Sequence, residues 1–111
     1  MKKSKKINKS QAAPKIDQTL LIRAREERNE SELTKLCEFG DLGVLVEIAK
    51  SEYASSTILG NLNNNYSISV RHEVAKNENT SKEILLMMLK DKDMLVRDYA
   101  RSNLVRLKAT V

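Results

Sequence analysis

The sequence predicts an all-α protein built from repeated pairs of short helices. Apolar residues recur at helical spacing over most of the chain, and many of these positions match when the sequence is shifted by 26 residues. Glycine occurs 3 times and proline once in 111 residues, which is few for a fold rich in turns between strands. We therefore expect an α-solenoid of stacked helix pairs.

The chain begins with a lysine-rich stretch that we expect to be a disordered tail over residues 1–16. Residues 1–19 carry six lysines against Asp17 alone, so their balance of 6 − 1 = +5 equals the formal net charge of the whole chain. Within residues 1–15 the one strongly apolar residue, Ile7, cannot bury enough surface to offset chain entropy. The tail would bind nucleic-acid phosphates without sequence preference, or it is only a solubilising extension. The candidate nucleic-acid contacts are Lys2, Lys3, Lys5, Lys6 and Lys9.

The repeat domain is expected to span residues 17–111 and to open with a helix over residues 17–28. Leu20, Leu21 and Ala24 form the apolar face of this helix, and its outer face is charged. Asn29 followed three residues later by Glu32 predicts a capping box at the start of a second helix. The apolar stripe of that second helix contains Leu33, Leu36 and Cys37.

Residues 67–91 read as one complete two-helix unit. The spacing predicts a helix over 68–75 with Val70 and Val74 inward and Ile68 as a further candidate, and then a turn over 77–81. Thr80 and Glu83 fit a second capping box before the next apolar stripe. That stripe contains Ile84, Leu85, Met88 and Leu89. Asp91 and Asp93 then end the helix and cap the last one, whose apolar positions are Met94, Val96, Tyr99, Ala100, Leu104 and Leu107.

The 26-residue shift aligns apolar columns and also polar positions. Arg71 aligns with Arg97, and Asn77 aligns with Asn103. One column contains Val44, Val70 and Val96, and another contains Leu33, Leu59 and Leu85. Because one short helix pair cannot bury its apolar face alone, residues 17–111 would stack about three and a half units around a continuous core.

One part of this pattern also resembles a known repeat family. It consists of Val70, Arg71, Val74, Ala75, Asn77, Thr80, Ile84, Leu85, Asp91, Asp93, Val96 and Arg97. Together these residues resemble the leucine-rich-variant repeat, a relative of the HEAT-like helical repeats, over residues 66–103 and less closely over 44–65. The family usually has prolines in the turn, where this chain has Glu78 and Ser81.

The resemblance implies a curved, right-handed superhelix of short helices that presents a surface to other macromolecules. Some HEAT-like relatives bind DNA, and a few excise bases from it. The founding type of the leucine-rich-variant repeat is associated with a cysteine-ligated iron–sulfur cluster. Cys37 is the only cysteine here, so the resemblance implies no such cluster and we expect no cofactor.

Three arginines are the first candidate contact residues. Arg71 and Arg97 stand 26 residues apart, and Arg101 follows Arg97 by one helical turn, so they could form a basic row for phosphates or an acidic helix. The alternative is structural, because Asp91 and Asp93 precede Arg97 and could tie neighbouring repeats through Asp–Arg contacts. Asn65 and Ser67 replace these acids before Arg71, so we expect Arg71 to have the freer guanidinium.

Two tyrosines are the other candidates. Tyr53 and Tyr66 fall between predicted helices, where an exposed ring could anchor a partner or stack on a base. The alternative is a ring lying over a helix end with its hydroxyl in water. We interpret His72 as a surface or groove residue and Cys37 as a small buried apolar residue. The Met87–Met88 pair and Met94 are expected to fill the core.

Composition excludes several functions. No apolar stretch is long enough to span a membrane, and a single cysteine and a single histidine leave neither a disulfide framework nor a metal site. No glycine-rich phosphate loop or nucleophile elbow is present, so we expect a non-enzymatic cytoplasmic protein.

The leading interpretation is a module that binds a protein through its concave face. The alternative is a nucleic-acid binder that combines the tail with the arginine row. We expect a monomer or a weak homodimer formed through the C-terminal helix.

Overall fold

The computed structural model describes residues 18–109, and this part of the chain contains seven α-helices and no strand. The lysine-rich tail therefore lies outside the described residues. The helices are α2 (Gln18–Glu26), α3 (Glu30–Phe39), α4 (Leu42–Lys50), α5 (Ser56–Leu62), α6 (Ile68–Lys76), α7 (Lys82–Met88) and α8 (Met94–Ala109). The all-α prediction is confirmed. No described helix is both long and apolar enough to cross a membrane.

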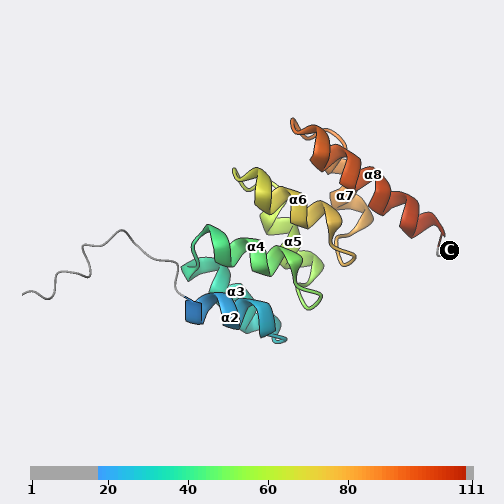
Figure 1. Cartoon of the computed structure of the whole chain (residues 1–111). Coiled ribbons are helices and arrows are strands. Elements are labelled where there is room, and N and C mark those ends of the chain that lie inside the picture. The colour runs from blue at the N-terminus through green and yellow to red at the C-terminus, as the bar shows by residue number, and fades with distance from the viewer. Residues whose placement is uncertain (1–17, 110–111) are drawn as a thin grey trace, which may run out of the picture.

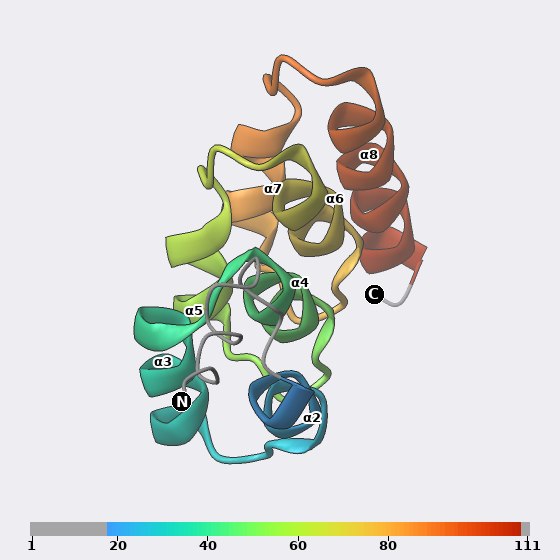
Figure 2. The same ribbon diagram turned by 60° about the vertical axis from the view of Figure 1, so that its left-hand side comes forward.

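The helices form two rows. Helices α2, α4, α6 and α8 lie side by side in the first row, each packed on the next (Figure 1). Helices α3, α5 and α7 form the second row on the other side (Figure 2). Helix α3 packs on α4, α5 on α6 and α7 on α8, whereas contacts within the second row are sparse. The first row is therefore the more closely packed of the two.

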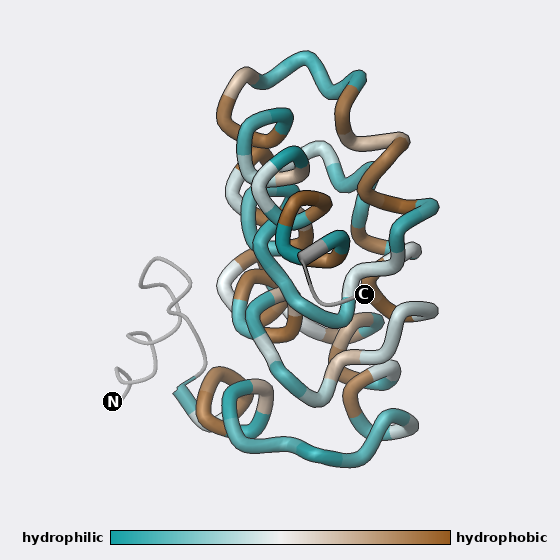
Figure 3. The backbone as a smooth tube through the Cα atoms, turned by 90° about the vertical axis from the view of Figure 1, so that its right-hand side faces the viewer, coloured by the Kyte–Doolittle hydropathy of each residue, from teal (hydrophilic) through white to brown (hydrophobic). Residues whose placement is uncertain are grey.

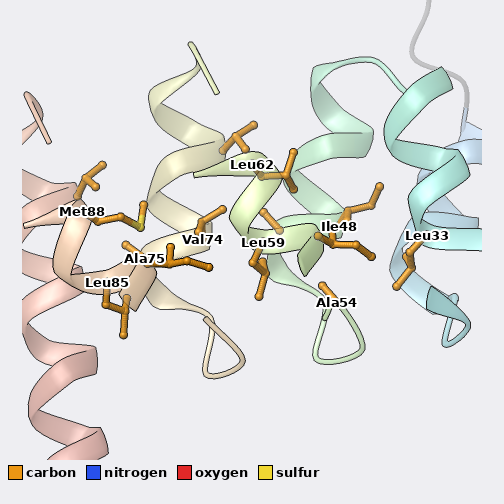
Figure 4. Packing of buried hydrophobic residues seen from close by; sticks show 14 of the residues in the cluster. Leu33, Ile48, Ala54, Leu59, Leu62, Val74, Ala75, Leu85 and Met88 are labelled. Atoms are coloured by element: carbon orange, nitrogen blue, oxygen red, sulfur yellow. The ribbon is translucent and has the colours of Figure 1, made fainter. Parts of the chain in front are cut away.

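A continuous apolar core fills the space between the rows (Figure 4). Leu33, Leu59 and Leu85, one of the predicted columns, are fully buried from successive second-row helices. Val44, Val70 and Val96 are buried in the same way from the first row. Apolar positions concentrate in the helices and the turns are mainly hydrophilic (Figure 3). The 26-residue periodicity thus corresponds to one first-row helix and one second-row helix.

A buried asparagine ladder connects neighbouring helix pairs. The Asn77 amide donates to the carbonyls of Ala49 and Ser51 at 2.8 and 2.9 Å. The Asn103 amide repeats this one unit later, donating to the carbonyls of Ala75 and Asn77, both at 2.9 Å. Each bond satisfies a carbonyl at or next to the end of the preceding first-row helix, where the backbone lacks a helical partner. The alignment of Asn77 with Asn103 therefore reflects shared structure.

Side-chain caps fix where the helices begin. Asn29 accepts from the Glu32 amide, which is one half of the predicted capping box, but the Asn29 amide donates to the Glu27 carboxylate and not to Glu32. Asp93 accepts from the Val96 amide. The predicted capping box at Thr80 is wrong. Ser81 caps α7, while the buried Thr80 hydroxyl donates to the Val74 carbonyl at 2.6 Å. That bond satisfies the end of α6, so Thr80 closes one helix while Ser81 opens the next.

The turn between α3 and α4 is the tightest in the array. It consists of Gly40 and Asp41, whereas longer turns precede α6 and α8. A Cβ atom on Gly40 would collide with the Val44 side chain and lie 2.7 Å from the Leu36 carbonyl oxygen. Gly40 is thus required by the close approach of the two helices.

Candidate interaction surface

The arginine row is largely a structural device. Arg71 donates through Nε and Nη2 to the two carboxylate oxygens of Asp91 at 2.9 and 3.1 Å. Its Nη1 donates to the carbonyls of Asn65 and Tyr66 at 2.9 and 3.2 Å. The Arg71 and Asp91 side chains are only 12% and 11% exposed. The expectation that Arg71 has the freer guanidinium is wrong, because its carboxylate partner, Asp91, comes from the turn before α8.

This pair sets the charge state of Asp91. Partial burial acts to raise the pKa of the carboxyl group, but hydrogen bonds from Arg71 and from the Asp93 amide, with the Arg71 charge, outweigh it. The pKa of Asp91 therefore lies below its ordinary value. Arg71 and Asp91 connect the start of α6 to the turn before α8, which is the inter-repeat tie considered as the structural alternative.

Arg97 and Arg101 are placed differently from Arg71. The Arg97 Nη1 donates to the carbonyls of Asp91 and Lys92 at 2.6 and 3.1 Å, repeating the local contacts of Arg71. Among the side chains of residues 18–108, no carboxylate pairs with Arg97. Arg101 lies on α8 and pairs with Asp98 at 2.8 Å on an exposed surface. The three arginines therefore do not form one open basic row.

His72 and Asp93 form a second tie between α6 and the turn before α8. The His72 Nε2 and an Asp93 carboxylate oxygen lie 2.8 Å apart, and the His72 ring packs edge-on against Tyr99 at 5.5 Å. The hydrogen bond with His72, with that from the Val96 amide, lowers the pKa of Asp93. Sequence reasoning missed this pair. The 26-residue alignment could have found it, because Asp93 caps α8, which packs beside the helix of His72.

The two candidate tyrosines are not brought together. Tyr53 lies in the turn between α4 and α5, where the Arg28 guanidinium sits 5.4 Å from its ring centroid. Tyr66 lies in the turn between α5 and α6 and is 85% exposed, the highest value among the large apolar and aromatic side chains of residues 18–108. Of these two tyrosines, Tyr66 therefore offers the more open ring.

Tyr66 stands on an open groove of about 900 Å³. One wall comes from the end of α5 and the turn before α6, and the other from α7 and the turn before α8. Ile68 and Met87 line it and are 45% and 58% exposed, while Met88 beside them is 2% exposed. The paired Arg71 and Asp91 also line it.

The groove belongs to a longer apolar edge. Leu42, Ile68 and Met94 are the first residues of α4, α6 and α8, stand 26 residues apart, and are 40%, 45% and 62% exposed. Phe39, at the end of α3, is also exposed. The turns before α4, α6 and α8 lie along one edge of the array (Figure 1). Met88 fills the core as predicted, but the expectation that Met87 and Met94 do so is wrong, because both point outward at this edge.

Within the described residues, no group of three or more potential ligands could hold a metal ion. Cys37 is half-buried against the core, and its pKa is raised by burial and then by the charge of Glu38. A raised pKa keeps the sulfur protonated and poorly nucleophilic.

Comparison with known proteins gives no match: no family model, curated protein or solved structure is similar to this chain.

Proposed function

We propose that the chain is a non-enzymatic protein-interaction module built as a short, right-handed superhelix of 26-residue repeats of the HEAT-like, leucine-rich-variant type. The repeated asparagine bonds of Asn77 and Asn103 support the repeat assignment, because the same contact recurs one unit later. We take the row of α2, α4, α6 and α8 as the concave side, because these helices pack more closely on one another than those of the second row. Stacked repeats of this kind provide extended surfaces for other macromolecules.

The single observation that carries the binding proposal is the exposed apolar edge. Tyr66, Ile68 and Met87 gather on one groove without contributing to the buried core. Contiguous exposed apolar side chains with a polar rim are typical of protein interaction sites.

The concave face is a weaker candidate binding surface than this edge. Many of its charges are already paired within the chain, as in Arg25–Glu47 at 3.4 Å and Arg101–Asp98 at 2.8 Å. A partner would have to compete with these ion pairs for the same charges. The proposal therefore places the main contact on the apolar edge, with the concave face as the second candidate surface.

Nucleic-acid binding is the alternative function, and the lysine tail favours it. The body contributes little, because Arg71 is occupied by Asp91 and Arg101 by Asp98. Binding would then depend on Lys2, Lys3, Lys5, Lys6 and Lys9 and would fall steeply with salt.

Two measurements on the full chain test the proposal. Duplex DNA and single-stranded RNA are titrated across a salt series with the wild type and with a variant in which the five tail lysines are replaced by glutamine. We expect the variant to lose nucleic-acid binding. We also expect the full chain to retain a protein partner from a nuclease-treated lysate. Salt-resistant nucleic-acid binding by the glutamine variant, or no retained protein, would contradict the proposal.

The proposed module acts in the cytoplasm, needs no cofactor, and is a monomer or a weak dimer formed through α8. The exposed Val105 on α8, at 61%, supports the weak-dimer possibility. Sedimentation across a concentration series distinguishes the two states, and a Val105→Ser variant would lose any dimer formed there.

A further inference from the structure

We infer that the groove between the α5–α6 and α7–α8 turns takes a short acidic segment of a partner protein. An apolar side chain of this segment would contact Tyr66, Ile68 and Met87, and its carboxylates would face Lys90 and Lys92. The inference rests on the proposed function and specifies the chemistry of the partner.

The groove has an apolar centre that stays accessible. Ile68 and Met87 come from different helices, and each leaves about half of its side chain in solvent. Gly60 lines the groove from α5 and adds no side chain to it. A leucine- or phenylalanine-sized group could therefore be removed from water there, and this burial is the main source of binding energy for such a segment.

The charges around this centre favour an acidic occupant. Both aspartates of the groove are already engaged, Asp91 by Arg71 and Asp93 by His72 and the Val96 amide. Lys90 and Lys92 are exposed and form no ion pair within the described residues. The groove thus presents two available positive charges and no available carboxylate, so a carboxylate-bearing segment is complementary to it.

The same charges disfavour the chain's own N-terminal segment as the occupant. Residues 1–19 carry a net charge of 6 − 1 = +5 by sequence, which Lys90 and Lys92 would repel. A separate acidic protein fits better. Binding of a second copy of this chain in the groove is one outcome that the test distinguishes.

The test uses three fluorescein-labelled peptides of about 15 residues, long enough for about four helical turns. The first combines leucines at helical spacing with glutamates, the second replaces the leucines by serine, and the third replaces the glutamates by lysine. Fluorescence anisotropy with the full chain measures each affinity. We expect only the first to bind, with an affinity that falls several-fold between about 0.05 and about 0.3 M salt because the rim charges are exposed. Equal binding of the lysine peptide, or no binding of the first peptide, would overturn the inference.

Matched variants locate the site. Ile68→Ser and the double variant Lys90→Glu/Lys92→Glu should each lower the affinity for the first peptide by about tenfold. Ile22→Ser is the control for Ile68, because Ile22 on α2 is 46% exposed, close to the 45% of Ile68, and lies outside both the groove and the apolar edge. Lys82→Glu is the control for the lysines, because Lys82 is exposed on α7 but does not line the groove. Far-UV circular dichroism checks that each variant remains folded.

The possible outcomes separate this inference from the proposed function. If Ile68→Ser binds the peptide no more weakly than Ile22→Ser, the groove assignment is wrong. If the chain self-associates in sedimentation and Ile68→Ser abolishes this, a second copy is the occupant and the inference is overturned. If protein capture from the lysate persists in the groove variants, the interaction function stands without this site. If no protein is captured by the wild type, the proposed function fails.

Discussion

Replacing Asn77 tests whether the buried asparagine ladder holds the helix pairs together. Asn77 is a buried residue, 8% exposed, and its side chain makes three hydrogen bonds. Its amide donates to Ala49 and Ser51 in the preceding repeat, and its Oδ1 accepts from the Asn79 amide at 2.8 Å. Asn77→Ala removes all three bonds and leaves their backbone partners without this side chain.

The magnitude follows from the number of bonds lost. At about 1 kcal/mol for each bond, Asn77→Ala should lower the free energy of unfolding by about 3 kcal/mol. A domain of this size has a total stability of about 5–15 kcal/mol, so the midpoint of thermal unfolding should fall by roughly 15 °C. Asn77→Ser should cost only about 2 kcal/mol. The equivalent Ser51 shows why, because its hydroxyl accepts from the Tyr53 amide at 3.0 Å, just as Asn77 accepts from Asn79.

Urea unfolding followed by far-UV circular dichroism measures these differences. Asn64→Ala is the control, because Asn64 is exposed and such surface changes usually alter stability by less than about 0.5 kcal/mol. We expect the order of stability to be wild type, Asn77→Ser and then Asn77→Ala. The reasoning is refuted if Asn77→Ala is as stable as Asn64→Ala, or if the serine variant is no more stable than the alanine variant.

Four further predictions test other parts of the structure. Arg71→Ala should destabilise the fold by about 3 kcal/mol, because it leaves the largely buried Asp91 carboxylate without its partner. Arg71→Lys should not restore stability, because lysine cannot donate to both Asp91 oxygens as arginine does. Urea unfolding measures both variants. The pKa of Asp91 is lower in the folded state than its ordinary value of 3.8. The contribution of Asp91 to stability is therefore present above pH 3.8 and is lost as the pH falls through the lower folded value. Asp91→Asn should accordingly reduce the acid sensitivity of the urea-unfolding midpoint. Gly40→Ala should cost about 1–3 kcal/mol by steric overlap. Gly60→Ala should be close to neutral, since its Cβ would meet only a flexible Ile84 methyl group at 3.3 Å, and equal effects at the two glycines would contradict this. Cys37 should react with a disulfide reagent at least about tenfold more slowly in the folded protein than in denaturant, and equal rates would show that burial does not protect it.

The helices and the core could be predicted from the sequence because both follow from apolar spacing. Val70, Val74 and Leu85 are buried as the periodicity requires. Helix boundaries that depend on a single hydrogen bond are harder to predict, as Thr80 shows. Its hydroxyl closes α6 instead of opening α7, and a Thr-x-x-Glu pattern does not distinguish these roles.

The candidate site was only partly predictable. Tyr66 is predictable because it lies outside the apolar columns. The exposure of Ile68 and Met87 is not, since helical spacing does not show which apolar residues a neighbouring helix covers. Arg71 was misjudged for a related reason. Its partner Asp91 lies 20 residues away in sequence, and the packing of α6 on α8 brings the two together.

The surface on which a partner binds can be observed directly by NMR. The isotope-labelled full chain is titrated with the acidic, leucine-containing peptide while its backbone amide shifts are recorded. If the chain is an interaction module that uses the apolar groove, the largest shifts will cluster at Tyr66, Ile68, Met87 and Lys90. Shifts concentrated on α2 and α4, or no shifts at peptide concentrations well above that of the protein, would contradict it.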